Sequence, residues 1–359
     1  MPLVAHTELP TFKRLAEEGE NVLPADRAGH QDIRELHIGI LNMMPDGALE
    51  ATERQFMRLV GACNQIAQFH IHLFTIDGLV HSVEMQAHIE QHYETFTQIK
   101  REGLDALIIS GANVTQANLD EEAFWQPLTE VFEWAKNNVT STLCSCLATH
   151  ALIQYCHGIK RTPLPSKRWG VFSHKVINRT YPIHPLMAES NTRFDVPHSR
   201  FNEVFEVDML NHGIKVLVKS EEAGVHLAVS CDGFRIVYFQ GHPEYDDISL
   251  LKEYKREVLL YFRNERDGYP PLPKNYFCEA VAHKFDSYQE EVMFAKQQQQ
   301  SFPVFPEAEV LAYIDNTWRD TAKSVFNNWL GTVYQITNQD RRLPFMAGID
   351  KNNPLGLDD

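Results

Sequence analysis

Short apolar runs alternate with amphipathic stretches along most of the chain. The apolar runs have the length of buried strands and lie at residues 36–45, 70–76, 106–110, 141–146, 214–218, 225–229 and 234–240. The stretches with helical spacing lie at residues 50–59, 81–99, 125–135, 147–155 and 249–263. Because strands that alternate with helices form a parallel sheet flanked by those helices, the pattern predicts an α/β fold.

Three segments lack this alternation. Residues 1–35 are polar and mixed, and we expect them to form an extension that packs on the body. Residues 159–200 are rich in Pro, Arg and His, which favours irregular loops. After a proline-rich break at 269–273, an amphipathic stretch from Glu307 to Tyr334 predicts one long terminal helix that packs back on the body.

Two of the apolar runs lead into polar residues that suit catalysis. Cys146 ends one run, and His242 follows another, with Glu244 two residues further on. A parallel sheet brings the carboxyl ends of its strands to one edge, so these side chains are expected to meet there. A thiol can serve as a nucleophile, an imidazole can activate it, and a carboxylate can orient the ring. The three residues therefore predict a Cys-His-Glu catalytic set.

The residues around Cys146 predict a sharp turn from strand to helix. Such a turn exposes the thiol and places it at the helix N-terminus, where the positive end of the helix dipole stabilises a thiolate. The backbone amide of Leu147, at the helix start, is a natural donor to the oxyanion of a tetrahedral intermediate. The turn from Gly111 to Asn113, at the end of another strand, is the predicted source of a second donor.

Composition and charge narrow the classes of function. The formal net charge of -15 over 359 residues is opposite in sign to the basic surface that binds nucleic acid or an anionic membrane. The sequence shows neither an apolar run of membrane-spanning length nor a signal-peptide pattern, so we expect a cytoplasmic protein. Its six cysteines are too sparse for a disulfide scaffold, and cytosolic thiols stay reduced. Composition thus permits a reactive thiol and small-molecule substrates.

Cys144, Cys146 and His150 lie close together in sequence and suggest a metal site at first sight. Their spacing is not that of a zinc site, and no second cysteine pair supports one. Cys144 lies two positions before Cys146 on the same strand, where a cysteine is commonly a small buried apolar residue. We therefore expect no metal and only one catalytic cysteine.

Five ordered blocks of the sequence resemble one enzyme family. The blocks lie at residues 41–45, 141–146, 196–200, 241–246 and 329–337. Together they resemble the homoserine O-acyltransferases of the succinyltransferase type, over most of the chain from Leu9 to Thr337. The resemblance implies the fold of class I glutamine amidotransferases, a parallel sheet flanked by helices with a cysteine at the turn, and here with an added C-terminal helical segment.

The resemblance also implies a division of the chain. Residues 1–35 would be the N-terminal extension, residues 36–265 an amidotransferase-like catalytic domain, and residues 266–359 a C-terminal extension with the long helix. Members of the family are commonly homodimers, and we expect the same here.

The resemblance implies roles for the matched residues. Cys146 would take the acyl group from an acyl-CoA, His242 would accept protons, and Glu244 would support His242. A substrate-binding lysine of the family falls on Lys167, and the positions that hold the amino-acid acceptor fall on Ser199 and Arg256.

The chemistry of these residue types fits acyl transfer. A CoA thioester and a cysteine thioester are close in free energy, so Cys146 can carry the acyl group between two half-reactions without ATP or a bound cofactor. His242 would first help to form the thiolate and later take the proton from the acceptor hydroxyl. The expected substrates are succinyl-CoA and L-homoserine, and the expected product is O-succinyl-L-homoserine for methionine biosynthesis.

The choice of acyl donor depends on one position in the family. It falls on Thr115, where relatives that use acetyl donors have glutamate and relatives that use succinyl donors have glycine. A glutamate would repel the free carboxylate of a succinyl group, and its absence favours succinyl-CoA. Threonine is bulkier than glycine and uncharged, so acetyl-CoA stays open as an alternative.

Three other functions fit part of the pattern. A glutamine amidotransferase-type amidase uses the same Cys-His-Glu set, but Cys146 lacks the flanking glycines usual at that turn. Serine differs from homoserine by one methylene, a small difference for a pocket to distinguish, so it stays open as an acceptor. A non-enzymatic binding protein on the same fold is the third alternative.

Overall fold

Eleven strands form a single sheet in the part of the chain that the computed structural model describes, residues 3–63, 67–177 and 183–357. Their order across the sheet is β2-β1-β4-β3-β5-β6-β11-β10-β9-β7-β8. The strands are β1 (Leu3–Ala5), β2 (Val22–Pro24), β3 (Glu35–Met43), β4 (Gln68–Phe74), β5 (Ala106–Ala112), β6 (Ser141–Ser145), β7 (Thr162–Val176), β8 (Arg193–Glu203), β9 (Lys215–Ser220), β10 (Gly224–Val229) and β11 (Ile236–Phe239).

The sheet is parallel from β2 to β11 and antiparallel from β11 to β8. The register aligns the carboxyl ends of the central strands, because Cys144 of β6 pairs with Ile109 of β5 on one side and with Tyr238 of β11 on the other. The predicted α/β fold with a parallel sheet flanked by helices is confirmed. The antiparallel half was not predicted.

Helices cover both faces of the sheet. One apolar core lies between the sheet and α1, α3 and α12, and a second lies between the other face and α5, α6, α7 and α8. The helices are α1 (Pro10–Glu17), α2 (Ala25–Ala28), α3 (Asp46–Gly61), α4 (Val83–His92), α5 (Phe96–Glu102), α6 (Trp125–Asn138), α7 (Leu147–His157), α8 (Glu206–Asn211), α9 (Ser249–Phe262), α10 (Glu279–Gln297), α11 (Glu307–Val310) and α12 (Arg319–Ile336).

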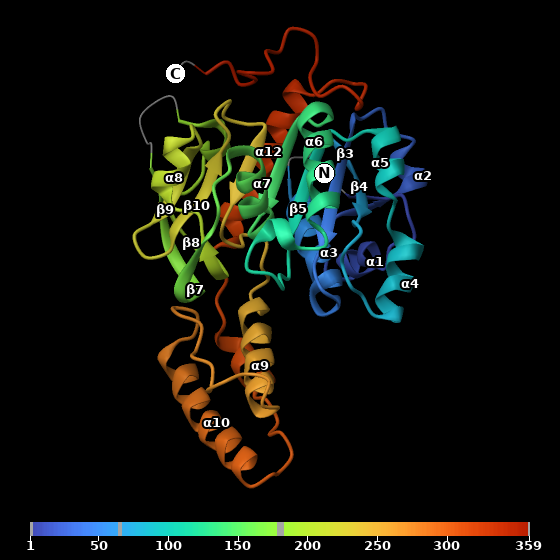
Figure 1. Ribbon diagram of the computed structural model, residues 1–359. Coiled ribbons are helices and arrows are strands. Elements are labelled where there is room, and N and C mark those ends of the chain that lie inside the picture. The colour runs from blue at the N-terminus through green and yellow to red at the C-terminus, as the bar shows by residue number, and fades with distance from the viewer. Residues whose placement is uncertain (1–2, 64–66, 178–182, 358–359) are drawn as a thin grey trace.

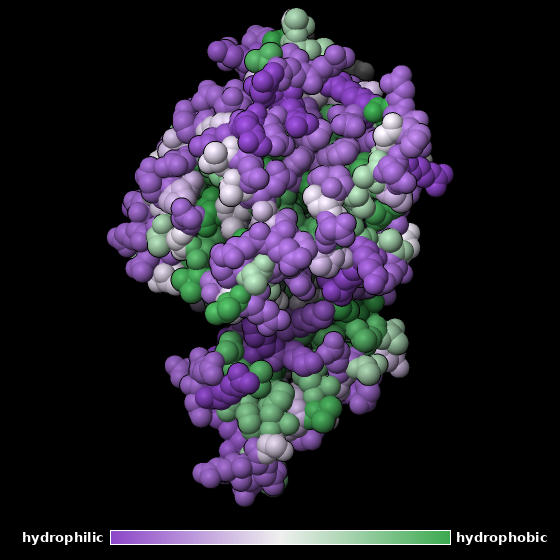
Figure 2. Space-filling model, turned by 90° about the vertical axis from the view of Figure 1, so that its right-hand side faces the viewer, coloured by the Kyte–Doolittle hydropathy of each residue, from purple (hydrophilic) through white to green (hydrophobic). Residues whose placement is uncertain are grey.

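A smaller lobe lies beyond one end of the sheet, where α9 and α10 stand apart from the main body (Figure 1). Its apolar core joins these two helices to Trp169 and Val171 of β7 and to Trp318. Hydrophilic residues cover most of the body in the space-filling view, whereas hydrophobic residues gather on the lobe (Figure 2). Among the helices that the structure describes, none is both long and apolar enough to cross a membrane.

Two segments that were predicted as single helices are broken. Residues 81–99 form α4 and α5, because Thr95 starts a new helix: its side chain accepts from the Gln98 amide at 3.2 Å, and the Gln98 side chain accepts from the Thr95 amide at 2.7 Å. The stretch from Glu307 to Tyr334 forms α11, a short 3₁₀ turn and α12. Here Asn316 Oδ1 accepts from the Arg319 amide at 2.9 Å, which begins α12 at Arg319.

The prediction of loops over residues 159–200 was wrong. Most of this segment forms β7 and the first part of β8, paired antiparallel, with Trp169 opposite Ser199. Prolines do not break the hairpin because Pro163 and Pro165 lie near the start of β7, where the pairing is interrupted until Arg168. β8 is the edge strand of the sheet, a place that tolerates the polar residues and prolines that looked irregular in the sequence.

The division at residues 35 and 265 stays a prediction. In the structure β1 and β2 extend the same sheet beyond β4, and α12 packs in the main core against α3. The residues before 35 and after 265 therefore contribute to the body, and α10 adds the outer part of the lobe.

Candidate active site

Cys146 lies at a strained turn between β6 and α7. Its backbone has φ 51° and ψ −106°, a region that costs a non-glycine residue about 1 to 3 kcal/mol. Neighbouring bonds hold this conformation: the Cys146 amide donates to Phe239 O at 2.8 Å, and Thr149 Oγ1 lies 2.8 Å from both Cys144 O and Phe239 O. The turn is therefore fixed to the end of β11, the strand that leads to His242.

His242 is held by its backbone and by its ring. Its amide donates to Pro197 O of β8 at 2.8 Å, and its Nδ1 lies 2.8 Å from Glu244 Oε1. Glu244 Oε1 also accepts from Ser145 Oγ at 3.1 Å, which links the carboxylate to the residue before Cys146. The predicted Cys-His-Glu set thus comes together at the carboxyl ends of β6 and β11.

Electrostatics favour a charged imidazole in this set. Burial lowers the pKa of His242, but the negative charge of the Cys146 sulfur and of the Glu244 carboxylate, both hydrogen-bonded to the ring, raises it well above the usual value. An imidazolium that forms beside a sulfur nucleophile stabilises the thiolate. The arrangement suits nucleophilic attack by Cys146 and proton exchange through His242.

A partly buried carboxylate that sequence reasoning missed joins the predicted substrate-binding residues Lys167 and Ser199. Glu253 of α9 accepts from Ser199 Oγ at 2.6 Å, and its Oε2 lies 3.3 Å from Lys167 Nζ. Its other oxygen accepts from Tyr245 Oη at 2.7 Å. Burial raises the pKa of Glu253, but the charge of Lys167 and these hydrogen bonds lower it by more. The net pKa therefore lies below the usual value. Glu253 therefore stays ionised.

Arg256 is not part of this hydrogen-bonded group. Its side chain is 59% exposed and bonds Glu257 at 3.4 Å. It lies three residues after Glu253 on α9, and residues at that spacing neighbour each other on a helix surface. The structure thus brings Lys167 and Ser199 together and leaves Arg256 at the solvent side of the same helix.

The predicted oxyanion donors lie around the turn. Leu147 is the first residue of α7, so its amide has no partner within the helix. Gly111 of β5 lies beside Cys146, since a Cβ on Gly111 would be 3.9 Å from the Cys146 Cβ. Asn113 is exposed in the loop beyond β5. The role of Asn113 stays a prediction.

Thr115, the position tied to donor choice, is bonded to a second carboxylate that sequence reasoning missed. The buried Glu122 accepts from the Thr115 amide at 2.6 Å, from Thr115 Oγ1 at 3.2 Å and from the Gln116 amide at 2.7 Å. Threonine itself is uncharged, but the Glu122 carboxylate places a negative charge next to this position.

Comparison with known proteins settles the family. A family model described as homoserine O-succinyltransferase matches residues 2–339. The chain belongs to this family. A homoserine O-succinyltransferase from Methylobacter tundripaludum is 71% identical over 357 residues, 99% of this chain and 100% of the relative. One from Methylococcus capsulatus is 64% identical over 357 residues, with the same two coverages. Membership of the homoserine O-succinyltransferase family makes the protein an acyltransferase, so the amidase and binding-protein alternatives are not supported.

Solved structures add a distant similarity. A glutamine amidotransferase from Thermotoga maritima aligns with 85% of this chain and 99% of its own, at 12% identity and a TM-score of 0.39. Such values are too low to support a conclusion about activity. The family assignment rests on the sequence matches.

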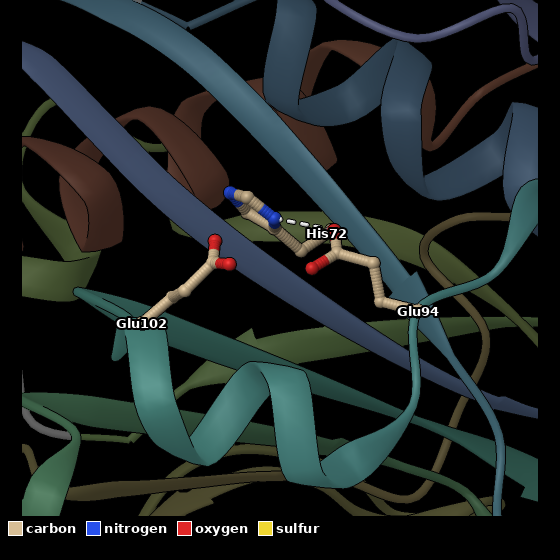
Figure 3. A group of neighbouring side chains, drawn as sticks. All are labelled: His72, Glu94 and Glu102. Atoms are coloured by element: carbon tan, nitrogen blue, oxygen red, sulfur yellow. Dashed lines mark hydrogen bonds and ion pairs between the residues drawn. The ribbon is translucent and has the colours of Figure 1, made fainter.

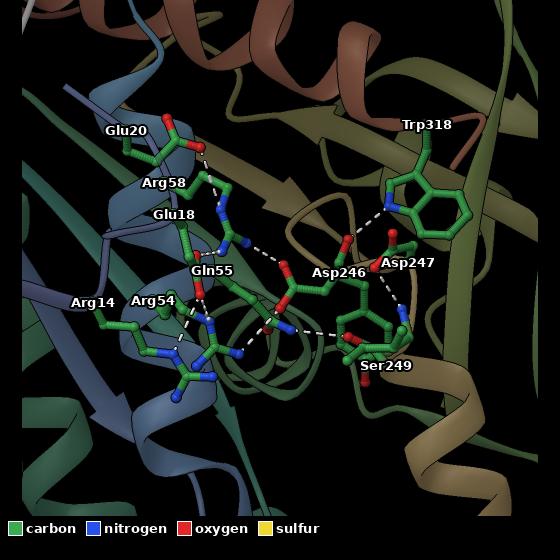
Figure 4. A network of polar contacts seen from close by, with 12 residues as sticks. Arg14, Glu18, Glu20, Arg54, Gln55, Arg58, Asp246, Asp247, Ser249 and Trp318 are labelled. Carbon is green, nitrogen blue, oxygen red and sulfur yellow. Dashed lines mark hydrogen bonds and ion pairs between the residues drawn. The ribbon is translucent and has the colours of Figure 1, made fainter. Parts of the chain in front are cut away.

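A polar network anchors the segment that follows Glu244 in this member of the homoserine O-succinyltransferase family (Figure 4). Arg54 and Arg58 of α3 both bond the Asp246 carboxylate, Arg54 at 3.2 Å. Trp318 Nε1 donates to Tyr245 O at 2.8 Å, and Gln55 donates to Ser249 at 2.9 Å. α3 and the start of α12 therefore hold the backbone between His242 and α9.

A group of three side chains away from the catalytic set resembles a metal site (Figure 3). The ligand atoms of His72, Glu94 and Glu102 lie within 4.8 Å of one another. However, His72 Nδ1 lies 2.6 Å from Glu94 Oε1, its Nε2 lies 2.8 Å from His37 Nδ1, and Arg101 donates to Glu102 at 3.0 Å. A hydrogen-bond network thus accounts for the group, and we assign it no ion.

Proposed function

We propose that this acyltransferase transfers a succinyl group from succinyl-CoA to the hydroxyl of L-homoserine through an acyl-Cys146 intermediate. One observation carries the mechanism: the Cys146 sulfur at a fixed strand-to-helix turn is hydrogen-bonded to His242, whose other nitrogen is held by Glu244. A thioester intermediate keeps the acyl group reactive, so neither ATP nor a bound cofactor is required.

In the first half-reaction the Cys146 thiolate attacks the thioester carbonyl of the donor. The oxyanion forms beside the Leu147 amide and the end of β5. As the C–S bond to CoA breaks, the CoA sulfur takes the proton from the His242 imidazolium. Acyl-Cys146 and a neutral imidazole remain.

In the second half-reaction neutral His242 accepts the proton of the homoserine hydroxyl. The oxygen attacks the acyl carbon, and the Cys146 thiolate leaves as the partner of the renewed imidazolium. Lys167, Ser199 and Arg256 bind the amino-acid end of the acceptor, with the Lys167 and Arg256 cations toward its carboxylate. Glu253 sets the positions of Lys167 and Ser199 through its two hydrogen bonds.

The remaining expectations from the resemblance belong to the same proposal. We propose a cytoplasmic homodimer that serves methionine biosynthesis. Sedimentation at several protein concentrations tests the dimer, and a monomer at all of them would contradict it.

Steady-state kinetics with two donors and two acceptors test the proposed reaction. We expect the highest kcat/KM for succinyl-CoA with L-homoserine, parallel double-reciprocal lines, and a product with the mass of O-succinyl-L-homoserine. Intersecting lines would contradict the ping-pong route. A preference for L-serine would overturn the acceptor.

One observation favours acetyl-CoA as a second candidate donor. Glu122 places a carboxylate against Thr115, at the position where a negative charge disfavours a succinyl donor. That charge is shared among two amides and a hydroxyl, which weakens its effect on a substrate. A higher kcat/KM for acetyl-CoA than for succinyl-CoA would establish the acetyl donor.

A further inference from the structure

The segment between α7 and β7 returns toward the catalytic turn. α7 starts directly after Cys146 and ends at His157, and the following Gly158, with φ 69°, turns the chain back. Two residues later Lys160 Nζ lies 3.9 Å from Asp120 Oδ2. Asp120 belongs to the turn Leu119–Glu121, which ends just before Glu122. Arg161 therefore lies beside the loop that carries Thr115.

The side chain of Arg161 is partly buried, and it forms no close ion pair with the described residues, although the negative charge of Glu122 acts on it. Its Nε is buried without a hydrogen-bond partner, and no carboxylate in the described part of the chain lies within ion-pair distance of the side chain. A partly buried charge is costly unless something pairs with it. The environment of Arg161 thus calls for an anion.

The charges around Arg161 locate that anion near the acyl group. Burial lowers the pKa of Arg161, while the negative charges of Glu122 and the Cys146 sulfur raise it, and the net pKa lies below the usual value. The guanidinium is therefore within electrostatic reach of both groups. An anion attached to Cys146 through a short chain would therefore be attracted to Arg161.

The other cations of the site already have partners. The negative charge of Cys146 also acts on Arg200. However, the Arg200 guanidinium donates to Asn202 O at 2.8 Å and to Ala223 O at 2.6 Å, and it lies 3.4 Å from a Glu203 oxygen. Lys167 is bonded to Glu253. Of these three described cations, Arg161 alone has no hydrogen-bonded or ion-paired anion.

We infer that Arg161 binds the free carboxylate of the succinyl group on the donor and on acyl-Cys146, an inference that rests on the proposed succinyl transfer. In an extended succinyl group the second carboxylate carbon lies about 4 Å from the thioester carbon. A guanidinium can bind this carboxylate with two hydrogen bonds. An acetyl group ends at its methyl and gains nothing from Arg161, so this residue selects between the two donors.

Donor kinetics of the full-length Arg161→Gln variant test this role, with Arg161→Lys as the charge-conserving variant. The matched control is Lys160→Gln, which removes the neighbouring cation that pairs with Asp120. We expect Arg161→Gln to lower kcat/KM for succinyl-CoA by about 10- to 100-fold. Turnover of acetyl-CoA should change little, Arg161→Lys should recover part of the succinyl activity, and Lys160→Gln should match the unmodified protein.

Equal losses with both donors, or no loss with succinyl-CoA, would overturn the role of Arg161 while leaving the proposed function intact. Use of acetyl-CoA but not succinyl-CoA by the unmodified protein would overturn both the role of Arg161 and the proposed function. The two failures are therefore distinguishable from the activity of the unmodified protein alone.

Protection of Cys146 from alkylation gives a second readout that needs no turnover. Free succinate should slow the reaction of Cys146 with iodoacetamide more than propionate does, because succinate has a second carboxylate that can bind Arg161 while the first lies at Cys146. The difference should disappear in Arg161→Gln and persist in Lys160→Gln. Equal protection by the two acids in the unmodified protein would count against the role of Arg161.

Discussion

The ring of Tyr245 stacks on the imidazole of His242, with centroids 4.3 Å apart and planes 20° from parallel. The hydroxyl of the same tyrosine donates to Glu253 at 2.7 Å. Glu253 in turn bonds Ser199 and Lys167. The proposed base His242 and the residues expected to bind the acceptor are therefore linked by a chain of contacts. A change at Glu253 should affect mainly the second half-reaction.

Replacement of this carboxylate tests the connection. In Glu253→Gln the ion pair with Lys167 is lost, while an amide oxygen can still accept from Tyr245 or Ser199. We expect kcat/KM for L-homoserine to fall by about 10- to 100-fold, since a hydrogen bond to a charged group is lost. Formation of acyl-Cys146, measured by rapid quench without acceptor, should change much less. A matched change at the exposed Glu290 to Gln should alter neither step, and an equal loss in both half-reactions of Glu253→Gln would contradict the assignment.

A second prediction concerns Gly241, which precedes His242. A Cβ at this position would lie 2.7 Å from Val196 Cγ1 and 2.8 Å from His198 Nε2, two side chains buried in β8. We expect Gly241→Ala to lower the free energy of unfolding by about 1 to 3 kcal/mol through overpacking and to displace His242. Gly331→Ala is the control, because a Cβ there meets no atom within 4 Å.

Gly331→Ala should raise the free energy of unfolding by about 0.5 to 1 kcal/mol, because alanine is more favourable than glycine inside a helix such as α12. Urea unfolding measures both variants. Equal stability of Gly241→Ala and the unmodified protein would show that the Val196 and His198 side chains move aside for the added methyl group at little cost.

Much of the candidate site was predictable, and the reason lies in its position in the sheet. Cys146 and His242 follow apolar strands, and a polar residue at such a strand end is visible in one sequence. Glu253 is not, because it lies within a run of charges on α9 that looks like a solvated helix face. The β7–β8 hairpin was missed because an edge strand carries a weak apolar pattern. Arg161 was missed because its lack of a close ion pair is a property of the folded chain.

Acid stability provides a third prediction. Burial lowers the pKa of His70 from 6.5 to about 4, helped by its histidine neighbours His6 and His72, and burial also lowers the pKa of His37 to about 2, helped by Arg341. The unfolded chain binds protons on these rings below about pH 6.5, whereas the folded chain resists until lower pH. Stability from the neutral rings is therefore full above pH 6.5 and is lost as the pH falls toward 4.

Unfolding by urea between pH 7.5 and 4.5 measures this loss. We expect the midpoint to decrease as the pH falls, and His70→Phe to show a shallower decrease because one group with a lowered pKa is gone. An identical slope in the two proteins would show that His70 does not contribute.

The fourth prediction addresses the carboxylate beside Thr115. Glu122→Gln removes a negative charge but keeps an oxygen that can accept from the Thr115 or Gln116 amide. We expect the ratio of kcat/KM for succinyl-CoA to that for acetyl-CoA to rise, since a charge that opposes the succinyl carboxylate is removed. Glu121→Gln, one residue earlier and exposed, is the control. A ratio that falls would mean that Glu122 supports succinyl binding through the loop.

The central claim is a covalent succinyl group on Cys146, and intact-protein mass measures it most directly. Mixed with succinyl-CoA in the absence of acceptor, the protein should gain about 100 Da, the mass of one succinyl group in a thioester adduct. The gain should be absent in Cys146→Ala and should disappear when L-homoserine is added. No adduct on the unmodified protein, together with continued product formation, would contradict the acyl-cysteine route.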